Sequence, residues 1–167
     1  MAGVIDLATL TPLLLPLADT LRAKGWRMAA AESCTGGLIA AACTSLAGSS
    51  DWFERGFVTY SNAAKSEQLG VDAALIADHG AVSAEVVRAM AAGALAHSPA
   101  DIAVAVTGIA GPGGAVPGKP VGSVWLAVML RGGVAQVEYL RLDGDRARVR
   151  AQTCVLALQR LRALCET

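Results

Sequence analysis

The chain has no excess charge of either sign and few aromatic residues. Its 167 residues carry 14 Lys and Arg against 14 Asp and Glu, and only 4% of them are Phe, Trp or Tyr. Without a basic stripe, attraction to nucleic-acid phosphates has little electrostatic support. No apolar run reaches the ~20 residues that a membrane-spanning helix needs. These absences argue against nucleic-acid binding and against insertion into a membrane.

Cysteine and histidine are too scattered to suggest a metal centre. The two histidines lie far along the chain from the four cysteines, and no two cysteines form a CxxC pair. The cysteines are Cys34, Cys43, Cys154 and Cys165. A structural zinc site needs such ligands at close spacing, so the sequence argues against one. Reduced thiols in a chain of this size are typical of the cytoplasm. The N-terminus also lacks the basic segment of a secretory signal, and we expect a cytoplasmic protein.

Apolar residues, by contrast, are abundant. They make up 54% of the chain, and Ala, Leu and Val must fill most of the core because aromatic residues are few. A chain of this length suits a single core, so we expect one domain over residues 1–167. Small side chains allow helices to pack closely against a sheet.

The apolar patterning predicts alternating helices and strands. Helices are expected over residues 7–24, 35–46, 62–69, 83–97 and 145–165, and strands over 26–31, 57–60, 102–106, 123–130 and 134–142. Pro12 fits the first turn of the first helix, and Gly25 ends that helix. Three residues, Arg131-Gly132-Gly133, join the last two strands as a hairpin. This order predicts a three-layer α/β/α fold with a mixed sheet.

Three segments rich in glycine and hydroxyl groups interrupt the apolar pattern. The first is Ala31-Glu32-Ser33-Cys34-Thr35-Gly36-Gly37, which lies between a predicted strand and a predicted helix. Unpaired N–H groups at a helix N-terminus attract anions, so this segment suits a phosphate or carboxylate, with Ser33 as a possible catalytic hydroxyl. An ordinary helix cap explains the same residues. Cys34 is either a reactive thiol or a small buried residue.

The second segment runs from Gly48 to Lys65 and contains Ser50 and Tyr60. A serine becomes a nucleophile only where a base takes its proton, and no histidine is nearby in sequence. A buried, neutral lysine can be that base, and a tyrosine can relay the proton, so Ser50, Tyr60 and Lys65 form a candidate Ser/Lys site. Alternatively, Lys65 is a solvated surface charge and Ser50 caps a helical turn.

Strand geometry raises an objection to Ser50. A strand over residues 57–60 covers roughly 10–13 Å, which can place Ser50 and Tyr60 at opposite ends. Ser33, Tyr60 and Thr107 all fall at predicted carboxyl ends of strands, where α/β sheets usually bind ligands. Ser33 is therefore a rival nucleophile, and the choice between the two serines stays open.

The third segment, Thr107-Gly108-Ile109-Ala110-Gly111-Pro112-Gly113-Gly114, follows a predicted buried strand. Its backbone N–H groups can hold an oxyanion or a phosphate, although a flexible surface loop has the same composition. It is not a P-loop, since no Gly-Lys-Ser/Thr follows. Arg146 lies in the first turn of the last predicted helix, where it opposes the helix dipole unless an anion offsets it.

Taken together, these segments resemble the C-terminal domain family of the competence/damage-inducible protein CinA, which includes bacterial nicotinamide-nucleotide amidohydrolases. The resemblance covers nearly the whole chain. Besides the first and second segments, it rests on His79-Gly80-Ala81-Val82-Ser83, Thr107-Gly108-Ile109-Ala110-Gly111-Pro112, Lys119-Pro120-Val121-Gly122-Ser123-Val124-Trp125 and Gly144-Asp145-Arg146. It implies a stand-alone form without the N-terminal pyrophosphatase-like domain of CinA proteins.

The resemblance also implies an activity, the deamidation of nicotinamide mononucleotide to nicotinate mononucleotide and ammonia without a metal or other cofactor. It implies Ser50 as nucleophile, Lys65 as base and Tyr60 as hydroxyl relay. The substrate-binding residues that it and the anion-binding segments imply are Ser33, Thr35, Gly36, Gly37, Thr107, Gly108, Gly111 and Arg146. The resemblance implies two kinds of partner, the nucleotide and further copies of the chain, since family members form homo-oligomers. A neighbouring subunit could then bring Ser50 to the Tyr60 and Lys65 of this chain despite the length of the strand between them.

Two functions of different classes follow. The first is the serine amidohydrolase. The second is a non-catalytic nucleotide-binding or interaction module in competence or DNA-damage responses, against which the intact Ser, Tyr and Lys set argues. Nucleotide binding without ammonia release would distinguish the second function from the first. The zero net charge of the chain argues against direct DNA binding as a third function.

Overall fold

A computed structural model describes residues 5–167 of the chain, which fold into α-helices and β-strands. The strands are β1 (Met28–Glu32), β2 (Phe53–Val58), β3 (Ile102–Gly108), β4 (Ser123–Leu130) and β5 (Gln136–Arg141). The α-helices are α1 (Thr11–Lys24), α2 (Leu38–Thr44), α3 (Asn62–Leu69), α4 (Ala73–His79), α5 (Ala84–Ala96) and α6 (Arg146–Cys165). Two 3-10 turns, η1 (Leu7–Leu10) and η2 (Ser49–Asp51), precede α1 and β2.

The strands form one mixed sheet in the order β2-β1-β3-β4-β5. Strand β1 pairs in parallel with both β2 and β3. Strand β4 pairs antiparallel with β3, and β5 pairs antiparallel with β4. In this register Glu32 of β1 lies beside Val58 of β2 and Val106 of β3. The carboxyl ends of these three neighbouring strands therefore lie side by side at the same end of the sheet.

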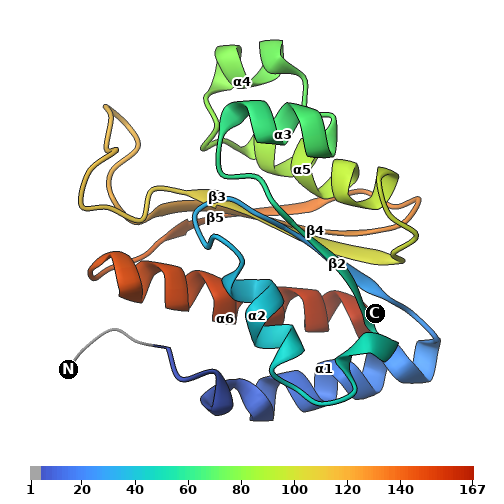
Figure 1. The fold of residues 1–167 in the computed structure, drawn as a ribbon. Coiled ribbons are helices and arrows are strands. Elements are labelled where there is room, and N and C mark those ends of the chain that lie inside the picture. The colour runs from blue at the N-terminus through green and yellow to red at the C-terminus, as the bar shows by residue number, and fades with distance from the viewer. Residues whose placement is uncertain (1–4) are drawn as a thin grey trace.

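Helices cover both faces of this sheet, as predicted (Figure 1). Helices α3, α4 and α5 lie on one side, and α2 and α6 lie on the other, with α1 packed against α6. The α/β fold with a mixed sheet is thus confirmed. No helix among residues 5–167 is long and apolar enough to cross a bilayer.

Alternate residues of the strands serve two apolar cores. Met28 and Ala30 of β1 face the core shared with α1, α2 and α6, whereas Ala29 and Ala31 face the core shared with α5. The second core meets the sheet through alanines, which let α5 approach closely. Continuous burial of β1 and of β3 up to Thr107 agrees with strands covered on both faces.

The predicted starts and ends differ from the observed ones mainly near the site. Strand β1 starts two residues later and ends one residue later than expected, and α2 begins at Leu38 rather than residue 35. Residues 33–37 form a turn instead, in which Gly36 and Gly37 have φ of 58° and 100°. Such left-handed conformations are open to glycine at little cost and stop a helix from starting earlier.

Two further differences concern β2 and α4. Strand β2 starts at Phe53 rather than residue 57 and includes the polar Glu54 and Arg55, because an edge strand has an exposed side. Helix α4 was not predicted; Asp72 caps it by accepting from the Ala74 amide. Helix α3 begins at residue 62 as predicted, and Ser61 caps it by accepting from the Ala64 amide.

Candidate functional site

A cavity of about 250 Å³ opens at the edge of the sheet where β1, β2 and β3 end. Its lining comes from the turn after β1, the segment after β2, α3, the linker before α5, the loop after β3 and the start of α6. The residues are Ser33, Cys34, Tyr60, Asn62, Lys65, Ala81, Val82, Thr107, Gly108, Ile109, Ala110, Gly111, Gly113, Gly114 and Arg146. Residues predicted from all three glycine-rich segments therefore meet here.

The main polar contact of the cavity joins Lys65 to Ser33. Lys65 is only 1% exposed, and its Nζ lies 3.0 Å from the Ser33 Oγ and 2.9 Å from the Thr59 carbonyl oxygen. Ser61 caps α3 and so places Lys65 on the first turn of that helix. Ser33 directly follows β1, and its amide donates to the Val106 carbonyl of β3. Two residues 32 positions apart are thus held in hydrogen-bond contact.

Burial changes the acid–base character of Lys65. Loss of water around the amine lowers the pKa of Lys65, and the smaller opposing influence is the neighbouring Cys34. A neutral amine has a lone pair that can accept the proton of a serine hydroxyl. The geometry and the direction of the pKa shift therefore suit Lys65 to act as a base toward Ser33.

Cys34 is the other potential nucleophile in this turn. Burial is the main cause that raises its pKa to about 12, and the Glu32 charge adds to the rise. The thiolate is the nucleophilic form of cysteine, so this thiol is inert at neutral pH. The structure favours the interpretation of Cys34 as a small buried residue.

The N-terminus of α2, predicted as an anion cradle, is filled by the chain itself. Thr35 is fully buried and donates its hydroxyl to the Glu32 carboxylate, which also accepts from the Gly37 amide. Of the predicted segment, Ser33 and Cys34 line the cavity, whereas Thr35, Gly36 and Gly37 do not. Sequence reasoning missed Glu32, although its place directly before Ser33 was visible.

The opposite wall of the cavity comes from β3, its following loop and α6. Thr107 is buried, and its hydroxyl donates to the Ala81 carbonyl at 2.9 Å. Gly108 and Gly111 line the cavity as predicted. Arg146 donates to the Gly111 carbonyl at 2.9 Å and to the Tyr60 hydroxyl at 3.0 Å. The guanidinium therefore bridges the loop and the segment after β2.

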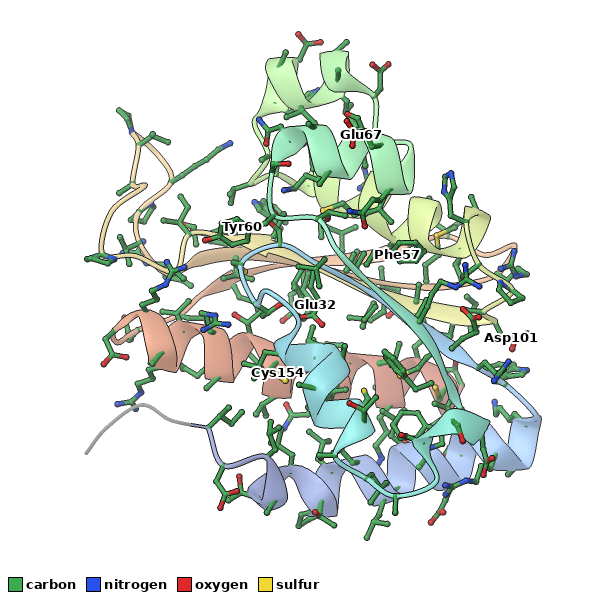
Figure 2. All side chains as sticks on the ribbon, viewed as in Figure 1. Glu32, Phe57, Tyr60, Glu67, Asp101 and Cys154 are labelled. Carbon is green, nitrogen blue, oxygen red and sulfur yellow. The ribbon has the colours of Figure 1, made fainter. Side chains whose placement is uncertain are left out.

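Tyr60 lies at the rim of the cavity rather than beside the amine. It is 62% exposed, and its recorded hydroxyl partner is Arg146. Figure 2 shows Tyr60 near the end of the sheet from which the loop after β3 projects. Its position suits contact with a bound ligand.

Ser50 is not brought to Lys65 within the chain. It lies in η2, before β2, whereas Tyr60 and Lys65 follow that strand. Ser50 is exposed, and its carbonyl accepts from the Arg27 guanidinium at 3.0 Å. The predicted strand-length objection is thus correct for a single chain. The serine next to Lys65 is Ser33.

Comparisons with known proteins identify the family to which the chain is similar. The CinA C-terminal domain family model matches residues 11–165. The chain is 54% identical over 139 residues to the nicotinamide-nucleotide amidohydrolase PncC of Enterobacter agglomerans, covering 83% of this chain and 85% of that one. It is 53% identical over 152 residues to PncC of Pseudomonas putida, covering 91% and 94%.

Other relatives are longer proteins or solved structures. A CinA-like protein of Citrifermentans bemidjiense is 57% identical over 146 residues, which are 87% of this chain but only 35% of that protein. A crystal structure of a competence/damage-inducible protein from Agrobacterium tumefaciens matches with a TM-score of 0.91 and 44% identity, covering 98% of this chain and 99% of that one. A CinA superfamily structure from Klebsiella pneumoniae matches with a TM-score of 0.89 and 40% identity, covering 93% and 96%.

Proposed function

The chain belongs to the CinA C-terminal domain family, and we propose that it hydrolyses the carboxamide of nicotinamide mononucleotide with Ser33 as nucleophile and Lys65 as base. Relatives of similar length named nicotinamide-nucleotide amidohydrolase place it among enzymes that cleave a linear amide. The observation that carries the mechanism is the 3.0 Å contact between the Lys65 Nζ and the Ser33 Oγ.

In the first step, the Ser33 oxygen attacks the carboxamide carbon while its proton moves to the neutral Lys65 amine. The tetrahedral intermediate then expels ammonia, which takes that proton from Lys65 and leaves an ester on Ser33. Water attacks the ester, again giving a proton to Lys65, and the serine recovers its hydrogen as the carboxylate departs. Backbone N–H groups around the cavity stabilise the transient oxyanion.

The nucleotide phosphate needs a cationic or N–H-rich partner, and the Glu32 carboxylate already occupies the α2 N-terminus. Arg146 and the loop over residues 108–114 are the remaining partners in the cavity. The Tyr60 hydroxyl accepts a hydrogen bond from Arg146, so Tyr60 is placed to contact the same part of the ligand as Arg146. We therefore assign the phosphate to the Arg146 side and the carboxamide to the Ser33 side.

Ammonia release by three variants tests the proposed chemistry. We expect Ser33→Ala and Lys65→Met to lose at least ~10³-fold in kcat, as removal of a nucleophile or its base does elsewhere, while nucleotide binding persists. Ser50→Ala is the matched control and should retain activity within about 2-fold, since Ser50 is exposed and is not among the residues that line the cavity.

Loss of activity in Ser50→Ala but not in Ser33→Ala would contradict the assignment and favour a site shared between subunits. Binding of nicotinamide mononucleotide without ammonia release by the folded wild-type protein would instead support the non-catalytic module. Both outcomes are visible in one comparison of ammonia release with calorimetric binding.

A further inference from the structure

Glu32 is a fully buried carboxylate that takes no part in the chemistry described above. Its Oε2 accepts from the Thr35 hydroxyl at 2.6 Å, the Gly37 amide at 3.0 Å and the Ile39 amide at 3.1 Å. Its Oε1 accepts from the Ala40 amide at 2.8 Å. Figure 2 shows the side chain between the sheet and α2. Four donors thus converge on one side chain directly before Ser33.

The arrangement requires a carboxylate rather than an amide. Each of the four hydrogen-bond partners of the Glu32 side chain is a donor. The NH₂ group of a glutamine at this position would therefore face another donor and could not accept its hydrogen. Partly unpaired amides at the start of α2 also favour negative charge. Burial is the main reason for the raised pKa of Cys34, Cys43 and Cys154, and the charge of Glu32 contributes to each rise.

The contacts of Glu32 fix the turn that carries Ser33. The positive φ values of Gly36 and Gly37 reverse the chain so that the Gly37 amide reaches back to the carboxylate. Arg150 of α6 holds the same turn from another side by donating to the Cys34 carbonyl at 3.2 Å and the Thr35 carbonyl at 2.8 Å. Between these two anchors, the turn has little freedom to move Ser33 away from Lys65.

We propose that Glu32 is a positioning residue that holds the Ser33 hydroxyl within reach of the Lys65 amine. The proposal rests on the Ser33–Lys65 pair of the proposed function but not on its substrate. The Glu32 side chain does not line the cavity, so it acts through the turn rather than by touching the ligand. Burial is the main cause that lowers the pKa of Lys65, and the Glu32 charge is not among the causes of that shift.

The test compares Glu32→Gln with the wild type in two assays. Turnover of nicotinamide mononucleotide should fall about 10- to 100-fold in kcat, the effect of misplacing a reacting atom by about 1 Å. KM should stay within about 2-fold, because the substitution leaves the contacts of Arg146 in place. A fluorophosphonate probe, which forms an Oγ–P bond and releases fluoride, should label Ser33 slower by the same factor.

Two controls separate positioning from stability. Ile39→Val weakens the packing of α2 but leaves every hydrogen bond of Glu32, so its labelling rate should equal that of the wild type. Thr35→Val removes one donor from Glu32, whereas Thr35→Ser keeps it. Labelling should slow in the first and recover in the second. This pair carries the test if Glu32→Gln does not fold.

The possible outcomes distinguish this inference from the proposed function. Labelling of wild-type Ser33 without turnover of the nucleotide overturns the substrate assignment only. Equal labelling rates in folded Glu32→Gln and wild type overturn the positioning role. Absence of any label on wild-type Ser33 overturns both, because no activated serine then exists for Glu32 to position.

Discussion

Lys65 places a long cationic side chain where water hardly reaches it, with 1% of its surface exposed. Keeping the charge there is costly, which is why burial lowers the pKa of this lysine. Neither His79 nor His97 is among the residues that line the cavity. The amine in contact with Ser33 is therefore the base of the proposed mechanism, in which its protonation state controls whether Ser33 can react.

The activity should rise with pH as Lys65 loses its proton. Because the pKa of Lys65 is lowered, the midpoint of this rise should lie below the ~10.4 of an exposed lysine. A pH profile of kcat/KM measures it. Lys65→Arg, which stays protonated throughout, should be inactive at every pH, and a profile that rises only near 10.4 would contradict a buried, neutral base.

At the scale of secondary-structure elements, the sequence predicted helices better than the turns between elements. The helices predicted to start at residues 83 and 145 are observed as α5 and α6, and the side chains of Ser83 and Asp145 cap them. By contrast, β2 was predicted too short because Glu54 and Arg55 look polar, and only sheet pairing shows that they belong to an edge strand.

The same limit applies to the site. The sequence placed Ser33, Tyr60 and Thr107 at strand ends, because each follows an apolar run, and the structure brings all three to one cavity. The partner of Lys65 could not be predicted, since it depends on a contact between positions 32 residues apart. The role of Glu32 was hidden for a similar reason: a buried carboxylate is recognised only through its donors.

Close packing between α3 and α5 supports the position of Lys65. A Cβ added at Gly93 of α5 would overlap the backbone carbonyl of Leu69, the last residue of α3. Gly93→Ala should therefore destabilise the protein by about 1–3 kcal/mol, although alanine favours a helix by about 1 kcal/mol. Urea unfolding measures the change. Gly113→Ala is the control and should stay within ~0.5 kcal/mol, because a Cβ added there would meet no heavy atom of residues 5–167 within 4 Å beyond its chain neighbours.

At the scale of the whole molecule, distant parts of the sequence close around one edge of the sheet. The parallel strands β1, β2 and β3 bring three connecting segments together. Helix α6, from the C-terminal end of the chain, then reaches across through Arg146 to the loop after β3 and through Arg150 to the turn after β1. Local signals fix the elements, whereas the site exists only once the whole sheet has formed.

Global stability should decrease at alkaline pH because all four cysteines are buried. Burial raises the pKa of Cys34 and Cys154 to about 12 and of Cys165 to about 11, and it also raises that of Cys43. Above the ~8.5 of an exposed thiol, the unfolded chain loses protons that the native state keeps, so stability falls by up to ~1.4 kcal/mol per thiol per pH unit.

Lys65 acts in the opposite direction, and the balance decides the outcome. Its lowered pKa means that the unfolded state binds a proton that the native state lacks, up to a pH of ~10.4, so this single group raises stability with pH. Above about pH 8.5 four thiols outweigh one amine, so urea midpoints measured from about pH 8.5 to 10 should fall. Cys165→Ala should show a shallower decline and Lys65→Met a steeper one. Equal slopes in all three proteins would mean that these groups titrate alike in the native and unfolded states.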